Sequence, residues 1–408
     1  MDRGRRGFLA GAAALALCSC GGGTPRGLMM QAQAAERPNP FVVVPDPGWN
    51  AWVASFKPRA RAAGIPEATL EAAFRGAGYI PAVIERDRAQ AEFTRTLGDY
   101  LQTAVSDRRV EGGRAALARH AALLAAVEDR FGVDKETVVA VWGLESSYGE
   151  NRGQVPVVSA LSTLAYDGRR GAFFESQLLS ALRILARGDI TPERMTGSWA
   201  GAMGHTQFIP TSFEEYAVDF TGDGRRDIWS DDPSDALASA ANYLARAGWR
   251  RGQPWGVQVV TDEGAGDARR TAAEWAARGV RPAAGGSLPD AGPARLIRPS
   301  GQPFLVYRNF DVIRRYNAAD TYAIGIGHLS DRLRGRPPLV GLFSSERPLT
   351  EAERIELQTR LSALGFDTGG TDGTVGPRTI QAIRDFQAAR GLPVTGFAEP
   401  SVLQALRR

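Results

Sequence analysis

The chain has 408 residues, of which 43% are hydrophobic and 23% charged, so it can bury a sizeable core and is not of the disordered class. Its three histidines are scattered and its two cysteines fall within the first twenty residues, which argues against a zinc site and against disulfides in the remainder. The net charge of +4 drops to +1 without residues 1–34, whose four arginines and one aspartate contribute +3, and no basic stripe with interleaved aromatics predicts nucleic-acid binding.

The first twenty residues have the features of an export signal. Arg5 and Arg6 precede an apolar run through Leu17 that is too short to cross a bilayer, and the paired arginines suggest the twin-arginine route. Two cleavage alternatives remain open. The run ending at Cys20 resembles a lipobox, so Cys20 would be lipidated and would anchor the chain in a membrane; cleavage after Ala34 would release an ordinary mature protein. We expect an exported, periplasmic protein, and lipidation would make it an outer-membrane lipoprotein.

Beyond a flexible tether, the long central region is mostly helical in pattern. Alanine- and leucine-rich stretches dominate residues 45–334, interrupted by short β-rich runs at 257–260, 296–297 and 304–307. Helices with one small sheet predict an α+β fold that is predominantly helical. We expect this region to form the larger, catalytic domain.

The last seventy residues predict a separate small unit. Residues 335–348 are rich in proline and polar residues and read as a linker, and residues 349–408 show three short amphipathic helices separated by Gly-containing turns. About sixty residues suffice for a marginal three-helix core.

One acidic residue stands out chemically. Glu145 lies near the end of an apolar helical segment that follows the expected N-cap Asp134, and Gly149 is the expected helix stop. Burial disfavours the charged form of a carboxyl group, and a neutral carboxyl can protonate the leaving group of a glycosidic bond. Ordinary glycosidases use two carboxylates, but no convincing partner is present, because Glu150 follows the helix stop and is expected to be solvated. The alternative is a buried glutamate that is only hydrogen-bonded.

A second acidic segment follows the spacing of a calcium-binding loop. Oxygen-bearing side chains occupy loop positions 1, 3, 5 and 9, with glycine at position 6; these side chains are Asp219, Thr221, Asp223 and Asp227. Position 12 is Ser230 instead of glutamate, so Asp231 or Asp235 would have to supply the last carboxylate. The alternative is an Asp-Gly turn with solvated acids.

Taken together, several motifs resemble the lytic transglycosylases of the membrane-bound B type, lysozyme-like enzymes that cleave peptidoglycan. The resemblance spans residues 49–334 and rests on the segments 145–149, 166–170, 197–204, 207–208, 242–243 and 316–317. The C-terminal unit resembles three-helix peptidoglycan-binding domains through the segments 357–358, 364–366, 372–373, 376, 379, 386–387 and 391–392.

The resemblance implies a reaction and a set of site residues. Glu145 would act first as acid and then as base in cleaving the bond between N-acetylmuramic acid and N-acetylglucosamine, leaving a 1,6-anhydro end. Arg169 and Arg170 would meet carboxylates of the substrate, and Asp235 would be the late calcium ligand. Ser198 would hydrogen-bond near Glu145, and the remaining residues implied to line the cleft are Gln207, Tyr243, Tyr316, Asn317 and Tyr100.

The same resemblance sets the expected partners and the rival functions. The chemistry would require no cofactor, a calcium ion would be structural, the partner would be peptidoglycan, and we expect a monomer. A hydrolytic muramidase using Glu145 with water, or a non-catalytic wall-binding scaffold, are the alternatives.

Overall fold

The structure is a computed structural model that describes residues 39–89, 96–341, 346–347 and 349–408. The predicted export signal, with Cys20 and the alternative cleavage point after Ala34, lies outside these residues. Within the described ranges, none of the helices combines the length and the apolar character needed to cross a membrane.

Two compact units interleave along the chain. Among the described residues, unit 1 comprises 39–89, 111–252 and 315–318, and unit 2 comprises 96–110, 253–314, 319–341, 346–347 and 349–408. The chain therefore leaves and re-enters unit 1 twice. The domain boundaries expected at residues 334 and 348 stay a prediction. The compact units are defined by packing, and residues on both sides of these two positions belong to unit 2.

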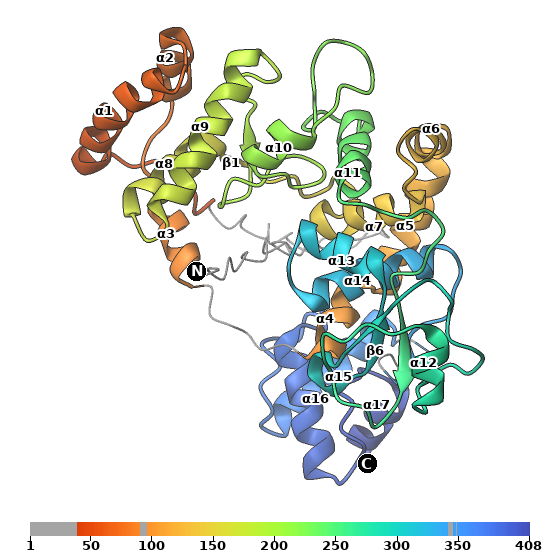
Figure 1. The fold of residues 1–408 in the computed structure, drawn as a ribbon. Helices are drawn as coiled ribbons and strands as arrows, with labels where there is room; N and C mark the ends of the chain where they lie inside the picture. The colour runs from red at the N-terminus through yellow and green to blue at the C-terminus, as the bar shows by residue number, and fades with distance from the viewer. Residues whose placement is uncertain (1–38, 90–95, 342–345, 348) are drawn as a thin grey trace. The chain divides into compact units, whose positions relative to one another are not determined.

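Unit 1 is built almost entirely of helices. Its elements, some of them labelled in Figure 1, are α1 (Pro47–Ala62), α2 (Glu67–Arg75), α3 (Pro81–Arg88), α5 (Asp107–Arg119, whose first turn belongs to unit 2), α6 (Ala121–Phe131), α7 (Lys135–Ser146), β1 (Val155–Pro156), α8 (Val157–Asp167), α9 (Gly171–Arg187), β2 (Thr196–Gly197), α10 (Pro210–Tyr216) and α11 (Ser234–Arg246).

The core of unit 1 forms where the apolar faces of these helices meet. Helices α8 and α9 pack along each other, and their inward side chains, such as Leu161 and Leu178, are fully buried. Strands β1 and β2 pair antiparallel with Val155 opposite Gly197. This pairing holds the start of the loop 197–208 in place against the helical core. Burial of this continuous apolar surface stabilises the unit without disulfides.

Unit 2 contains the small sheet. Strands β3 (Gly256–Val260), β4 (Arg281–Pro282), β5 (Arg295–Ile297) and β6 (Phe304–Val306) pair antiparallel in the order β4-β3-β6-β5. Three of these strands coincide with the β-rich runs predicted from the sequence. The other elements of this part are α4 (Leu97–Ala104), α12 (Ala272–Ala277), a 3₁₀ turn (Pro299–Gly301), most of α13 (Arg308–Tyr316) and α14 (Asp320–Leu333).

The three predicted C-terminal helices are also present, as α15 (Glu351–Ala363), α16 (Pro377–Ala389) and α17 (Pro400–Arg407) (Figure 1). Thr350 begins α15 with a capping box, in which its hydroxyl accepts from the Glu353 N–H while the Glu353 carboxylate accepts from the Thr350 N–H. Buried leucines, isoleucine and phenylalanine from the three helices form a shared core. The α+β, predominantly helical fold with a C-terminal three-helix unit is therefore confirmed.

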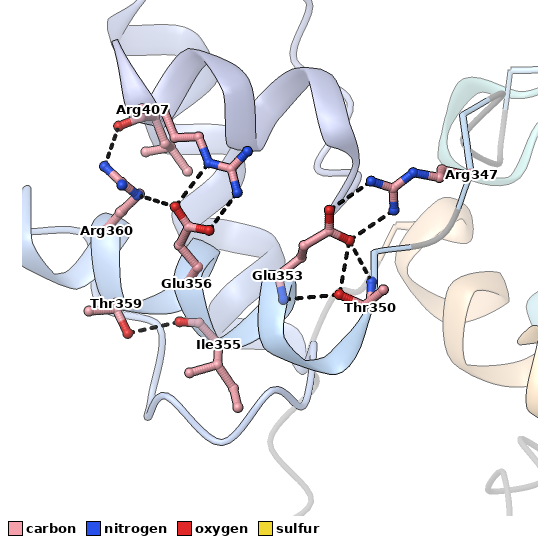
Figure 2. A network of polar contacts seen from close by, with 9 residues as sticks. Arg347, Thr350, Glu353, Ile355, Glu356, Thr359, Arg360 and Arg407 are labelled. Atoms are coloured by element: carbon pink, nitrogen blue, oxygen red, sulfur yellow. Dashed lines mark hydrogen bonds and ion pairs between the residues drawn. The ribbon is translucent and has the colours of Figure 1, made fainter.

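Ion pairs join the first and last of these helices on the surface (Figure 2). The Glu356 carboxylate of α15 accepts from Arg407 Nη2 of α17 at 2.6 Å and from Arg360 Nε at 2.8 Å, while Arg347 pairs with Glu353. The arginines are exposed and the glutamates partly so, and water and salt therefore screen their attraction. The apolar core, more than this network, holds the unit together.

Candidate active site

Glu145 occupies the last turn of α7, whose other side chains are deeply buried. Val138, Val139 and Val141 are fully buried and Trp142 is nearly so, whereas Glu145 itself is only half-buried. The apolar surroundings predicted for this helix are present, and the carboxyl group still reaches the surface of unit 1. Glu150 is exposed, as expected of a solvated acid.

The end of α7 differs from the prediction. The helix stops at Ser146, not at Gly149, and Ser147, Tyr148 and Gly149 all adopt positive φ, at 50°, 61° and 89°. Two consecutive non-glycine residues in the left-handed region are uncommon and carry strain. Three consecutive left-handed residues turn the backbone away from the helix axis directly after Ser146, so Glu145 is the second-last residue of the helix.

Asp134 occupies the predicted N-cap position at the other end of α7. Its carboxylate accepts from Trp249 Nε1 at 2.8 Å and from the Gly252 N–H at 3.1 Å, so it ties the start of the helix to the loop after α11. Helix α7 is thus anchored at its first turn by a buried acid.

Ser198 holds a tight turn. Its N–H donates to the Ala202 carbonyl at 2.7 Å, and its hydroxyl oxygen accepts from the N–H groups of Ala200 (3.3 Å) and Ala202 (3.1 Å). Bridges from Gly197 to Met203 and from Met203 to Phe208 then shape the segment 197–208 as a compact loop. Ser198 therefore shapes the loop that precedes Gln207.

Gln207 has a fixed orientation within this loop. Its φ is 52°, and its side-chain amide donates to the carbonyls of Gly204 (2.8 Å) and Arg152 (3.1 Å). The positive φ and the two hydrogen bonds leave the half-buried side chain little freedom. Arg152 was not singled out from the sequence, because a single arginine in a loop gives no signal of a backbone partner 55 residues away.

Tyrosines form a cluster around the same loop. The rings of Tyr243 and Tyr316 lie 4.8 Å apart between centroids, Phe208 lies 5.8 Å from Tyr316, and Tyr216 lies 4.3 Å from Tyr243. Both predicted tyrosines use their hydroxyls, Tyr243 donating to the Arg315 carbonyl at 2.5 Å and Tyr316 to the Thr206 carbonyl at 2.6 Å. Tyr216, at the end of α10, is a member of this cluster that the sequence did not reveal.

The tyrosine cluster lies close enough to Glu145 for the charge of that residue to affect the pKa of Tyr316. Burial raises the pKa of Tyr316 well above its usual range, and the charge of Glu145 adds to this rise. Burial also raises the pKa of Tyr243 to about 12. Both phenols therefore remain neutral donors at physiological pH. Asn317, directly after Tyr316, is buried. The structure thus brings Tyr243 and Tyr316 together beside the loop that carries Gln207, with Tyr316 close enough to Glu145 to feel its charge.

The two predicted substrate arginines differ in their contacts. Arg169 forms a bidentate pair with the buried Asp87, with Nε to Oδ2 and Nη2 to Oδ1 both at 2.6 Å. Arg170 lies over the rings of Phe173 and Phe174, at 4.5 and 5.1 Å from their centroids, and burial lowers its pKa. Asp87, 82 residues from Arg169 in the chain, was not foreseen.

Tyr100 is described within unit 2. It lies on α4 and is half-buried. The other predicted cleft residues all belong to unit 1.

The acidic loop before α11 gathers carboxylates around Asp235. Oxygens of Asp219, Asp223 and Asp235 lie within 4.8 Å of one another. Buried Asp235 accepts from the N–H groups of Phe220 (2.8 Å), Thr221 (3.1 Å) and Asp227 (2.9 Å). Burial raises the pKa of Asp235, and the charge of Asp219 adds to the rise.

The other two predicted calcium ligands take different places in this loop. Thr221 Oγ1 donates to Asp219 at 3.3 Å, and Asp227 Oδ1 accepts from the N–H groups of Trp229 and Ser230 at 2.9 and 3.0 Å. Both therefore support the loop through internal bonds. The three clustered carboxylates are the chemically suitable cradle for a hard cation.

These features define a class: a helical, lysozyme-like domain with one half-buried acid at the end of an apolar helix, followed by a three-helix unit. Residues 48–331 match the transglycosylase SLT domain, and residues 350–406 match a peptidoglycan binding domain. The chain therefore belongs to the SLT family of lytic transglycosylases, enzymes that cleave peptidoglycan.

Among its relatives is membrane-bound lytic murein transglycosylase B of Escherichia coli (strain K12), 34% identical over 207 residues, which are 49% of this chain and 56% of that protein. The match thus spans about half the length of that relative. SltB3 from Pseudomonas aeruginosa, solved in complex with NAG-anhNAM-pentapeptide, is 45% identical with a TM-score of 0.70, covering 89% of this chain and 100% of SltB3. Slt35 of Escherichia coli, solved in complex with calcium, is 26% identical with a TM-score of 0.61, covering 71% of this chain and 93% of Slt35.

Proposed function

We propose that this chain cleaves the β-1,4 bond between N-acetylmuramic acid and N-acetylglucosamine of peptidoglycan and leaves a 1,6-anhydromuramic end. The observation that carries the proposal is Glu145, half-buried at the end of α7 beside Tyr316, within a domain of the lytic transglycosylase family. SltB3, which is similar over its full length, was solved with a fragment that contains an anhydro sugar.

The reaction needs only one protein carboxyl group. Protonated Glu145 gives its proton to the glycosidic oxygen as the bond from that oxygen to the muramoyl C1 breaks, and the N-acetyl group of the sugar stabilises the developing positive charge. The 6-hydroxyl of the same muramoyl residue then attacks C1 and gives its proton to the Glu145 carboxylate. The acid is regenerated, and no water is consumed.

The neighbouring residues bind and orient the glycan in this proposal. The ring faces of Tyr243 and Tyr316 suit sugar rings. Their hydroxyl hydrogens and the Gln207 amide hydrogens bond within the protein, so these three residues would meet sugar hydroxyls through their oxygens, as acceptors. Ser198 and Asn317 complete the wall, and Tyr100 is proposed as a further contact. Arg170 and the exposed part of Arg169 meet the lactyl or peptide carboxylates.

The test is mass spectrometry of the products released from isolated sacculi. We expect muropeptides one water lighter than their reducing counterparts. Glu145→Gln should lower product release by about 10²–10⁴-fold, the usual contribution of a general acid, while still sedimenting with murein. Glu150→Gln is the matched control, because that acid is exposed five residues further along the chain, and it should retain wild-type activity.

Two outcomes would replace the proposal. Reducing-end products would identify a hydrolytic muramidase that still uses Glu145 but transfers the sugar to water. Binding to murein without any product would identify a scaffold.

The acidic loop is proposed to hold a structural calcium ion through Asp219, Asp223 and Asp235, with Thr221 and Asp227 shaping the loop. Three clustered carboxylate oxygens fit a hard, oxygen-preferring cation, and the ion would offset the repulsion that contributes to the raised pKa of Asp235. The ion would brace the loop and take no part in bond cleavage.

Calcium titration of the full chain tests this site. Added calcium should raise the melting temperature, Asp223→Ala should abolish the rise, and Asp267→Ala, an exposed acid of unit 2, should preserve it. The absence of any calcium response in the wild type would favour a simple Asp-Gly turn.

The C-terminal helices are proposed to hold the enzyme on the wall and raise its local concentration there. A shortened protein ending at Gly341, which keeps the two hydrogen bonds between Val340 and the buried Gln258 of β3, should cut soluble glycan at the wild-type rate and pellet less with sacculi. Unchanged pelleting would remove this role.

Export to the periplasm, with lipidation at Cys20, is proposed from the N-terminal pattern alone. The mass of the mature N-terminus distinguishes a lipidated Cys20 from cleavage after Ala34, and Cys20→Ala should release the protein from membranes only in the first case. A monomer is expected in both cases.

A further inference from the structure

His205 is a buried residue that contacts both flanks of Glu145. Its ring nitrogen Nδ1 lies 3.0 Å from Nε1 of Trp142, which is one helical turn before Glu145 on α7. Its backbone carbonyl accepts from the hydroxyl of Ser146, the residue after Glu145, at 2.5 Å. One residue outside α7 thus holds the helical turn that presents the acid.

The partners of the imidazole fix its protonation state. The Trp142 indole N–H can only donate, so Nδ1 of His205 must be the acceptor. The Ser230 carbonyl, 2.7 Å from Nε2, can only accept, so Nε2 must carry the hydrogen. Arg152 Nη1 also lies 3.4 Å from Nε2, but it donates to the Trp229 and Ser230 carbonyls at shorter distances. Burial lowers the pKa of His205, which agrees with a neutral ring. The ring therefore has one tautomer and one orientation.

The other side of His205 is fixed to the end of the acidic loop. The His205 N–H donates to the Ile228 carbonyl at 3.0 Å, and the Arg152 guanidinium donates to the carbonyls of Trp229 (2.9 Å) and Ser230 (2.7 Å). The carbonyl that accepts from the imidazole is thus itself held in place. His205 connects a rigid support to the catalytic helix.

Gly149 provides the space for this connection. A Cβ atom at Gly149 would lie 2.5 Å from His205 Nδ1, at the nitrogen that accepts from Trp142. The left-handed turn after Glu145 and the position of the imidazole therefore depend on each other.

We propose that His205 is a positioning residue for Glu145, holding the end of α7 through the Trp142 indole and the Ser146 hydroxyl. This inference rests on the proposed function, because it concerns the placement of the general acid. The proton donor of a glycosidic cleavage must meet one oxygen atom, and small displacements of such a group lower the rate of the chemical step more than substrate binding.

The test separates the two hydrogen bonds of the imidazole. In His205→Asn the side-chain oxygen can replace Nδ1 as the acceptor for Trp142, whereas in His205→Gln the amide nitrogen can replace Nε2 as the donor to Ser230. On a soluble glycan strand we expect His205→Gln to lower kcat by about 10–100-fold with KM within about twofold. His205→Asn should retain kcat within about threefold, because it keeps the bond to the catalytic helix.

A double-mutant cycle tests whether the effect passes through Trp142. Trp142→Phe should lower kcat by itself, and adding His205→Gln to it should cause little further loss if one hydrogen bond carries the effect. Losses that multiply would overturn the proposal. His120→Gln is the matched control, because the His120 ring packs against the same indole at 5.5 Å between centroids; it should leave kcat near the wild-type value.

A spectroscopic measurement on the wild-type full chain does not depend on how well the variants fold. Nitrogen NMR should show His205 as the Nε2–H tautomer, and the indole N–H signal of Trp142, assigned with Trp142→Phe, should move in His205→Gln but not in His205→Asn. The opposite tautomer, or equal kcat in the wild type and His205→Gln, would overturn the positioning role. If the wild type gave no anhydro products, the proposed function would fail, while the NMR result would still decide the tautomer.

Discussion

Two Asp-Gly loops in this protein are folded around a buried polar side chain, but the side chains differ in charge. In the acidic loop of unit 1, the carboxylate of Asp235 on α11 accepts from three backbone N–H groups. In the C-terminal unit, the amide of Gln358 on α15 accepts from the Gly373 N–H at 2.7 Å and donates to the Thr374 carbonyl at 3.0 Å. Both central side chains are almost completely buried.

The difference decides whether a loop is complete by itself. An amide both donates and accepts, so Gln358 satisfies its loop without leaving charge behind. A carboxylate only accepts, and the buried Asp235 lies beside the partly exposed Asp219 and the exposed Asp223, so negative charge gathers at a carboxylate that water solvates poorly. The C-terminal loop has a neutral centre, with its one carboxylate, Asp372, exposed, and is a finished structural element, whereas the loop around Asp235 is a site suited to a cation.

The largest effect on stability is expected from placing a charge at the neutral centre of the C-terminal loop, where Gln358 lies. Gln358→Glu replaces the amide donor by an oxygen that faces the Thr374 carbonyl, and an uncompensated buried charge should destabilise the C-terminal unit by about 3–5 kcal/mol at pH 7. The folded-state pKa of the new acid would be raised, so stability should recover as the pH falls. Denaturant unfolding measures this, with exposed Gln404→Glu as the control. A loss equal to that of the control would show that the amide is not required.

A smaller effect is expected from removing the charge of the acidic loop. Asp235→Asn keeps one acceptor oxygen but turns an NH₂ group toward backbone donors, which should destabilise unit 1 by about 1–3 kcal/mol without calcium. In calcium the difference from the wild type should widen, because the variant loses the ion as well. Calorimetry with and without calcium measures both quantities. A difference that does not change with calcium would contradict the contrast between the loops.

The pH dependence should follow the charged loop. Because the pKa of Asp235 is raised, the calcium-free folded protein keeps a proton that the unfolded chain releases, so this contribution to stability is present at low pH and is lost as the pH rises through the folded pKa. Calcium needs the deprotonated carboxylate, so the calcium-induced rise in melting temperature should shrink as the pH falls. Melting curves at neutral and mildly acidic pH measure this. A calcium response independent of pH would place the ion away from Asp235.

The smallest effect is expected at the exposed ion pairs of Figure 2. The arginines Arg407 and Arg360 lower the pKa of Glu356 to about 2, yet all three side chains are in contact with solvent, which screens the attraction. Glu356→Gln should therefore change the melting temperature only slightly, and high salt should remove the difference. A change comparable with that of Gln358→Glu would mean that charge, and not loop architecture, stabilises the C-terminal unit.

Local sequence signals were enough for much of the fold. The three C-terminal helices and the β-rich runs of the small sheet each follow from residues close together in the chain. The apolar surroundings of Glu145 were likewise visible, because they lie within one helix.

The parts that sequence could not predict depend on distant partners or on unusual backbone. The helix stop at Ser146 instead of Gly149 arises because Ser147 and Tyr148 adopt left-handed φ, which neither residue type favours. The pairing of Arg169 with Asp87 and the contact of His205 with Trp142 join residues 82 and 63 positions apart. A single sequence gives no periodic signal for such contacts.

The interleaving of the two units has a consequence for how the active site is completed. Tyr316 belongs to unit 1 but lies more than sixty residues beyond the previous segment of that unit, which ends at residue 252. During synthesis, the partner of the Thr206 carbonyl is therefore absent until most of the chain has been made. Unit 1 can form its helical core early, but the tyrosine cluster near Glu145 is complete only after residues 253–314 of unit 2 have been synthesised and Tyr316 is available. A growing or truncated chain would thus contain the acid before it contains a complete site, and folding of the site should be slow relative to that of the core.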